Sequence, residues 1–363
     1  MPTDTNTRGR LIRRGQKAAA RNMSRQLDQQ AAELRQTYQA ALNDIHNELS
    51  ALTDSEGMIP IERLEQAERI AETRLRTLGR QTEALIEAGL NRSVSIGIGP
   101  WEGIDDIAPQ QIAQNTARFV REFRDENGLQ LSDRLWRVNR GARETVIDAI
   151  EDNIVRGRNA HQAARDLLLR GESIPGDLMD ARTLATLDKI QQRTTEALLT
   201  GEGNPYYNAE RVFRTEMNRA FGETAIQAAA EHPQVRAVRF VLSPNHPEPD
   251  ICDLHAQANL HGLGPGVYPI DNHPWPAHPN TLSYLEPILV DEITDEDRAG
   301  RETMTKFIND QPAAKQDQIL GGKAKGWAWR QGHLSARQVR TPWKKLRPQL
   351  QRKGIDIPGR FAP

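Results

Sequence analysis

Two long stripes of apolar residues near the N-terminus constrain the fold more than any other feature of the sequence. Within each stripe the residues recur at steps of four and three, a spacing that places them along one face of an α-helix. The first stripe comprises Leu27, Ala31, Leu34, Tyr38, Ala41, Ile45, Leu49 and Leu52, and the second comprises Leu64, Ala67, Ala71, Leu75, Leu78, Thr82 and Leu85. We therefore predict a helical hairpin over residues 17–92, with its turn between Thr53 and Pro60. The stripes must be buried against each other or against a partner protein.

The segments on either side of the hairpin lack such stripes. Residues 1–16 are rich in arginine, which indicates a flexible basic arm. Residues 93–103 are rich in glycine and show no helical period, so we expect a linker that contains at most a short strand. From residue 104 to residue 200 helical spacing returns, for example at Val146, Ile150 and Ile154, and predicts a helical region.

Beyond residue 200 the apolar period changes from that of a helix to that of a strand. Alternating apolar residues over Val235–Ser243 predict a strand, and Ser283–Ile293 is expected to be its return strand. With the long helix that precedes them, these strands predict an α+β module over residues 201–320. The expected fold class is therefore mainly α, with an N-terminal helical hairpin, a helical middle and a short β-sheet that carries a Cys/His-rich loop.

The loop between the two predicted strands gathers residue types that ligate metals. Together with the residue at position 246, it holds the only cysteine, Cys252, and five of the nine histidines, which are His246, His255, His261, His273 and His278. Zinc accepts cysteine, histidine and carboxylate ligands in tetrahedral geometry. Cys252 and His255 are spaced C-x2-H, and His278 follows at a distance typical of the second ligand pair in zinc ribbons. We therefore predict Cys252, His255 and His278 as zinc ligands, with Asp250, His261 or His273 completing the set.

Two other interpretations of this loop stay open. Its histidines could make local hydrogen bonds in a proline-rich surface loop, or Cys252 could act as a nucleophile with a histidine as its base. Arg214 and Glu216, on the preceding helix, form either a catalytic pair or an ion pair between helices. The sequence shows no strained turn and no third group that would orient a base, so we expect a protein that is not an enzyme.

The C-terminal segment, residues 321–363, is strongly basic although the formal net charge of the chain is −1. It holds eleven lysines and arginines against Asp356 alone, and three tryptophans lie among them. Basic residues neutralise phosphates and tryptophans can stack on bases, so this tail predicts contact with nucleic acid that is independent of base sequence. The alternatives are a solvated basic face and a protein-docking tail. The candidate contact residues are Lys323, Lys325, Arg330, Arg337, Arg340, Lys344, Lys345 and Arg347.

The composition excludes several protein classes. A single cysteine excludes an internal disulfide framework and is typical of folding in a reducing cytoplasm. The polar N-terminus gives no sign of a signal peptide, and we find no apolar run of membrane-spanning length, so no membrane partner is expected. Hydrophobic residues make up 37% of the chain and aromatic residues 5%, which is low for a compact globular protein. Such a composition favours long helices, some of which need a partner.

The order of these segments resembles the phage Mu F-like minor head protein family, also called phage head morphogenesis proteins. The likeness covers residues 100–340. It is carried by LQLSDRLWR with the helix after it, by VFRTEMNRAFGETAIQAA with its Arg214–Glu216 motif, by DICDLH…HPNTLSYLEPI, and by the closing segment Phe307–Val339. In the third stretch, Cys252 matches the first cysteine of the family's D-x-x-C-x-x-C…H-P-x-C-R-C signature, and His278 and Pro279 match its His-Pro pair. The chain departs from the signature at His255, Thr281 and Ser283, where the family has cysteine.

This resemblance implies a structural protein of the virion that acts in head assembly. The expected partners are the portal protein, the major capsid or scaffolding protein, and packaged double-stranded DNA. The expected location is the head interior or the portal vertex, after assembly in the host cytoplasm. The departures from the signature imply a loop held by hydrogen bonds and prolines, with zinc as a residual cofactor. The competing hypotheses are an ADP-ribosyltransferase-like effector on the same module and a DNA-binding protein outside any virion.

Overall fold

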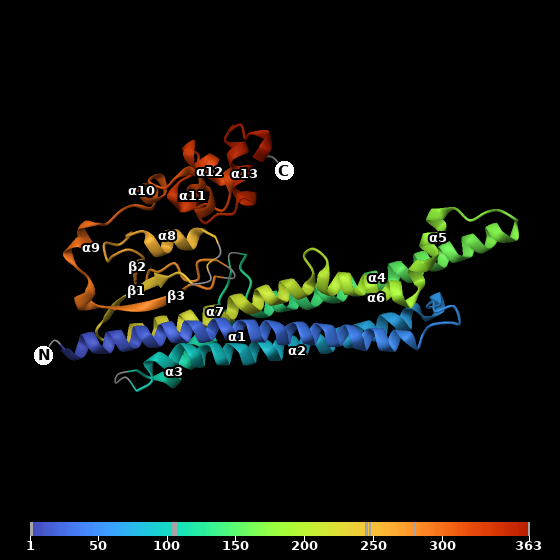
Figure 1. Cartoon of the computed structure of the whole chain (residues 1–363), viewed down its shortest axis with the longest axis horizontal. Helices are drawn as coiled ribbons and strands as arrows, with labels where there is room; N and C mark the ends of the chain where they lie inside the picture. The colour runs from blue at the N-terminus through green and yellow to red at the C-terminus, as the bar shows by residue number, and fades with distance from the viewer. Residues whose placement is uncertain are drawn as a thin grey trace. The chain divides into compact units, whose positions relative to one another are not determined.

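The computed structural model describes residues 3–103, 107–125, 127–243, 246, 248–278 and 281–361, with side chains from residue 9 onward. The chain divides into two compact units. The first unit comprises Met1–Ser24, Arg92–Arg118 and Asn218–Pro363, and the second comprises Arg25–Asn91 and Phe119–Met217. The expected fold class is confirmed, because the described residues form mostly long helices together with a small three-stranded sheet (Figure 1).

The second unit is built from helices. They belong to α1 (Thr3–Ser50), α2 (Leu64–Ile98), α3 (Pro109–Glu122), α4 (Leu131–Leu169), α5 (Gly176–Arg182), α6 (Leu187–Thr195) and α7 (Pro205–Glu231), with short helical turns at Ile61–Arg63, Thr183–Ala185 and Glu196–Thr200. The predicted hairpin is present: α1 and α2 pack together, and Arg74 on α2 forms an ion pair with Glu48 on α1. Leu34, Tyr38 and Ile45 of the first stripe are each 0% exposed. The first stripe and most of the second are therefore buried within the second unit.

Two expectations about the hairpin's flanks are corrected. The arm predicted as flexible belongs to α1, and within the first unit Ile12 is 2% exposed and Arg13 pairs with Glu292 at 2.6 Å. The predicted linker is the last part of α2 followed by a helical turn, Gly99–Trp101. Val94 and Ile98 continue its buried face, and a Cβ at Gly97 would lie 2.9 Å from the carbonyl oxygen of Phe221. The glycine that suggested a linker thus permits a close approach between helices.

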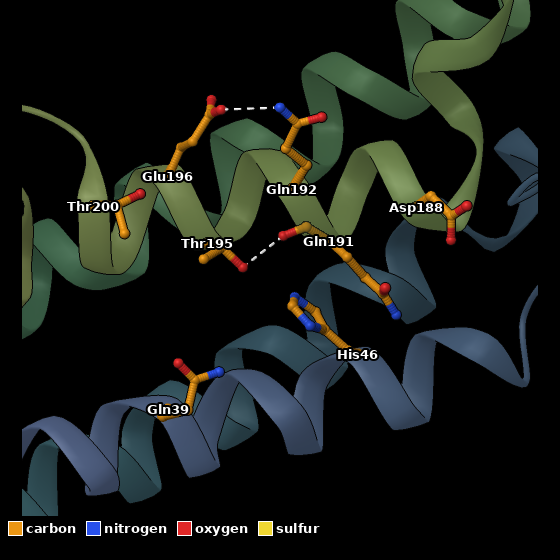
Figure 2. Close-up of a pocket in the computed structure, with 8 residues that line it drawn as sticks. All are labelled: Gln39, His46, Asp188, Gln191, Gln192, Thr195, Glu196 and Thr200. Carbon is orange, nitrogen blue, oxygen red and sulfur yellow. Dashed lines mark hydrogen bonds between the residues drawn. The ribbon is translucent and has the colours of Figure 1, made fainter.

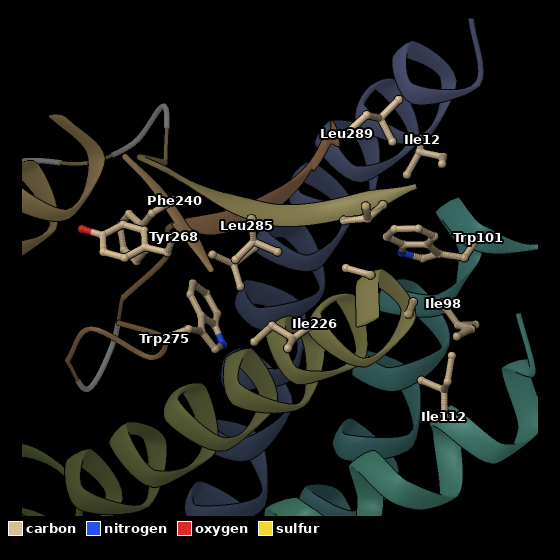
Figure 3. Packing of buried hydrophobic residues seen from close by; sticks show 14 of the residues in the cluster. Ile12, Ile98, Trp101, Ile112, Ile226, Phe240, Tyr268, Trp275, Leu285 and Leu289 are labelled. Atoms are coloured by element: carbon tan, nitrogen blue, oxygen red, sulfur yellow. The ribbon is translucent and has the colours of Figure 1, made fainter. Parts of the chain in front are cut away.

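The sheet of the first unit consists of β1 (Val235–Val241), β2 (Val267–Pro269) and β3 (Tyr284–Leu289) in the antiparallel order β2-β1-β3. Both predicted strands are therefore present, and β2 is an additional short strand from the loop between them. One face of the sheet packs in a cluster with Ile98, Trp101 and Ile226, as Figure 3 shows. Ala237, Val267 and Ile288 form a second small cluster, so the middle of the sheet is buried on both sides.

The basic C-terminal segment and the helices that precede it fold into a helical lobe. Its helices are α9 (Asp295–Ala299), α10 (Met304–Asn309), α11 (Ala313–Ile319), α12 (Lys323–Arg330) and α13 (Trp343–Arg352), with turns at Val290–Glu292, Ala336–Gln338 and Gly359–Phe361. Trp329, Leu346 and Leu350 are buried with Leu254 of α8 (Ile251–Gln257). The tail is thus part of the first unit, and Trp329 stabilises its core. No helix within the described part of the chain combines the length and apolarity of a membrane span.

Candidate metal centre

The candidate site begins at the first turn of α8. The Asp250 carboxylate accepts a hydrogen bond from the backbone amide of Cys252 at 2.6 Å, and Asp253 Oδ2 accepts one from the amide of Asp250 at 2.9 Å. These reciprocal bonds form a capping box, which satisfies amides that the first turn of a helix leaves without partners. The cap therefore fixes Asp250 and Cys252 next to each other.

His278 joins this turn from a distant part of the loop. Its Nε2 lies 3.0 Å from Oδ2 of Asp250 and 3.1 Å from Sγ of Cys252. Cys252 is fully buried, whereas the side chains of Asp250 and His278 are 36% and 32% exposed. Burial alone would raise the pKa of Asp250, but hydrogen bonds from His278 and from the Cys252 amide hold that pKa below its usual value. The carboxylate therefore stays negatively charged at neutral pH.

A second group of ligand-type side chains shares Asp250. His246 Nε2 lies 2.9 Å from Oδ2 of Asp253 and 3.8 Å from Oδ1 of Asp250. Both sets, Asp250–Cys252–His278 and His246–Asp250–Asp253, hold their ligand atoms within 4.8 Å of one another. Sequence reasoning missed Asp253, although the spacing of two aspartates around a helix start is a recognisable capping signal.

His255, a predicted ligand, lies outside both groups. Its ring packs against Phe240, and its Nδ1 lies 3.3 Å from the hydroxyl of Tyr268. Burial, and next the positive charge of Arg340, lower the pKa of His255 to about 3, so the ring is neutral. Its Nε2 is buried and has no hydrogen-bond partner within the described residues.

The two alternative ligands from the loop are also directed elsewhere. The ring of His261 packs against Tyr268 with centroids 5.3 Å apart. His273 Nδ1 accepts a hydrogen bond from the amide of Trp275 at 3.3 Å. Pro279 of the His-Pro pair lies outside the described residues. Of the predicted ligand set, the structure brings together Asp250, Cys252 and His278.

Helix α7 anchors the loop that carries His278. Asn218 donates a side-chain hydrogen bond to the carbonyl oxygen of Thr281. Thr281 in turn places Oγ1 3.5 Å from Sγ of Cys252, and both Thr281 and Ser283 are buried. The indole of Trp275 packs directly on Gly222, where an added Cβ would lie 2.0 Å from Nε1. Thr281 and Ser283, which stand at two of the positions where the Mu F-like signature has cysteine, are small polar side chains and are buried.

Arg214 and Glu216 form separate ion pairs within the second unit. Arg214 pairs with Glu210 at 2.9 Å and with Asp28 at 3.3 Å. Glu216 is 0% exposed and pairs with Arg134 of α4. The contacts with Asp28 and Arg134 join α7 to other helices, and the contact with Glu210 joins two turns of α7. This is the arrangement of structural ion pairs and not of a catalytic pair.

The predicted nucleic-acid residues separate into three kinds. Lys325 is buried and donates to the carbonyl oxygen of Val339 at 2.6 Å, so it is not a surface contact. Arg330 pairs with Asp317 at 2.8 Å, and Arg340 donates to the carbonyl oxygens of Pro276 and Ala277. The others lie at the surface, with Arg347 partly covered: Lys323, Arg337, Lys344, Lys345 and Arg347.

The second unit carries an open pocket between α1 and the α6 region (Figure 2). Its lining is polar and comprises Gln39, His46, Asp188, Gln191, Gln192, Thr195, Glu196 and Thr200. Several of these groups are engaged by their own helix: Thr195 donates to the carbonyl of Gln191 at 2.7 Å, and Gln192 donates to Glu196 at 3.2 Å. His46 bonds Thr194 at 2.8 Å, and burial lowers its pKa. This arrangement offers hydrogen-bonding groups to a polar ligand.

No protein-family model, no curated protein and no solved structure matches this chain. The cluster around Asp250 can hold a cation or act as a hydrogen-bonded knot. The exposed basic residues of the C-terminal lobe can attract anions.

Proposed function

We propose that the chain is a structural minor head protein of a tailed bacteriophage, which acts in head assembly. It would bind the portal protein, contact major capsid or scaffolding protein, and lie in the head interior or at the portal vertex. One observation supports the proposal more than any other. Three of the stretches that resemble Mu F-like proteins pack into one module: the part of α7 from Asn218, the loop from Asp250, and the closing segment Phe307–Val339.

The contacts within this module support the resemblance at the level of individual residues. Asn218 of the first stretch bonds Thr281 of the second, and Cys252 and His278 of the second contact each other. Leu254 of the second stretch packs with Phe307 and Trp329 of the closing segment. A likeness confined to unrelated surface segments would not generate such contacts.

The surface of the C-terminal lobe supports a contact with packaged DNA. Lys323, Arg337, Lys344 and Lys345 are exposed, and the segment from residue 321 has a surplus of ten positive charges. DNA inside a head presents closely spaced phosphates, and basic side chains bind them by releasing counterions. A DNA-binding protein outside any virion shares this feature, so particle association distinguishes the two functions.

Incorporation into particles tests the proposal. Phage particles produced with a tagged copy of the chain are separated on a density gradient, treated with nuclease and washed in high salt. The chain should remain with the heads and crosslink to the portal protein. If nuclease and salt release it completely, the protein binds DNA outside the head structure and the proposal is wrong.

One surface variant makes the same experiment specific for docking. Leu169 is 79% exposed at the end of α4, and it is an apolar side chain with no packing role of its own to lose. Leu169→Asp should fold normally and serves as a surface probe of the portal contact. Leu34→Asp is unsuitable, because Leu34 is 0% exposed within the second unit and its replacement would unfold the protein.

A further inference from the structure

We propose that Asp250, Cys252 and His278 form a site for one zinc-class divalent cation, with a fourth coordination position open to solvent. This inference does not depend on the proposed role in phage heads. It keeps Asp250, Cys252 and His278 from the set predicted from the sequence and leaves out His255, whose ring packs against Phe240.

The distances between the three donor atoms suit a single small cation. A tetrahedral zinc ion spaces a sulfur and a nitrogen ligand by about 3.5 Å, and a nitrogen and an oxygen ligand by about 3.3 Å. His278 Nε2 lies 3.1 Å from Cys252 Sγ and 3.0 Å from Asp250 Oδ2. A movement of a few tenths of an ångström would therefore admit the ion, and His278, which is partly exposed, can make it.

The chemistry of the donors selects the kind of cation. A thiolate and an imidazole favour zinc over magnesium and calcium, which prefer oxygen ligands. Asp250 supplies a charged carboxylate, and its Oδ1 is fixed by the amide of Cys252 at 2.6 Å. A ligand oriented by such an outer hydrogen bond loses less freedom when the metal binds.

Thr281 adds a polar contact at the edge of the three residues. Its side chain is buried, and its Oγ1 lies 3.5 Å from Cys252 Sγ.

The partial exposure of two ligands leaves room for a water molecule as the fourth ligand of the ion. The side chains of Asp250 and His278 are 32–36% exposed, so solvent reaches the site on one side. Three protein ligands with a water in the fourth position is the arrangement of zinc sites that exchange ligands, whereas closed structural sites use four protein ligands. We therefore expect the ion to be removable by a chelator without unfolding the protein.

Metal analysis of the purified full-length chain tests this site. After incubation with zinc chloride and gel filtration, the protein should retain about one zinc per chain. Cys252→Ser and His278→Ala should reduce it to background, whereas the control His261→Ala, which changes a histidine of the same loop outside the group, should retain it. Equal zinc in Cys252→Ser and in the unchanged protein would overturn the proposal.

Two further measurements keep the test decisive if a variant folds poorly. Asp250→Asn preserves a good helix cap but removes the charge, so it should fold and bind zinc at least about tenfold more weakly. Cobalt(II) should give a sulfur-to-metal charge-transfer band that is missing in Cys252→Ser. A folded Asp250→Asn with unchanged affinity, or cobalt without the band, would show that the loop is a hydrogen-bonded knot and not a metal site.

Discussion

Lys325 donates a hydrogen bond of 2.6 Å from its buried ammonium group to the carbonyl oxygen of Val339. This contact joins α12 to the segment that follows it and lies inside the C-terminal lobe. A lysine that the sequence pattern assigned to the DNA-binding surface thus stabilises the lobe internally. Burial lowers the pKa of Lys325 to about 8.

Replacing Lys325 should change how stability depends on pH. Because the folded-state pKa lies below the unfolded value of 10.5, the unfolded chain binds more protons between about pH 8 and pH 10.5, and stability rises with pH there. Relative to Lys325→Met, the unchanged protein should gain about 1–3 kcal/mol across this range. Urea unfolding at both ends of the range measures the difference. The same comparison with Lys323→Met, a change at an exposed neighbour, should show no such difference in stability between the two pH values. An equal difference for both substitutions would contradict the assignment.

Gly222 should be intolerant of any side chain. A Cβ there would lie 2.0 Å from the indole nitrogen of Trp275, so Gly222→Ala should destabilise the protein by about 1–3 kcal/mol. Gly141→Ala in α4 is the control, since no atom lies within 4 Å of its added Cβ. That change should be neutral or stabilising by up to about 1 kcal/mol. Thermal unfolding of both variants measures these effects, and similar melting temperatures would refute the packing described here.

The ion pair between Glu216 and Arg134 should contribute far more than the ion pairs at the surface. Glu216 is 0% exposed, so Glu216→Ala leaves Arg134 without its partner in a largely buried place and should cost about 3–5 kcal/mol. Glu144 pairs with Arg140 at 3.1 Å on an exposed helix face, and Glu144→Ala should cost less than about 1 kcal/mol. Denaturant unfolding compares the two. A small loss for Glu216→Ala would mean that the pair is dispensable.

Binding to duplex DNA should depend on the exposed lysines of α13. Lys344→Glu/Lys345→Glu should weaken binding and reduce the slope of log affinity against log salt by about two, because two phosphate contacts are lost. Lys325→Met should bind as the unchanged protein does, since Lys325 is buried. Fluorescence anisotropy with a duplex at several salt concentrations measures both. If the unchanged protein does not bind, or binds equally at all salt concentrations, the lobe is a protein-docking element.

The spacing of apolar residues was enough to predict the helical hairpin and the two longer strands. Their side-chain periods are properties of local backbone geometry: a step of three or four returns to one helix face, and a step of two returns to one strand face. Leu34 and Tyr38 are buried as their spacing requires. The helical period does not identify the residues that pack against a stripe, however. The structure shows that the first stripe and most of the second are buried within the second unit.

Which residues make up the candidate site depends on contacts between segments that are far apart in the sequence. His255 has the spacing of a ligand, but its ring packs against Phe240 and Tyr268, while the cap of α8 presents Asp250 to His278. Likewise Lys325 and Lys323 look equivalent in a basic segment, but only Lys325 is buried, with its ammonium group bonded to the carbonyl oxygen of Val339. Sequence spacing fixes which residues share a turn of helix. Contacts between segments far apart in the chain fix which of those residues meet, because burial and hydrogen bonding are satisfied only in the folded module.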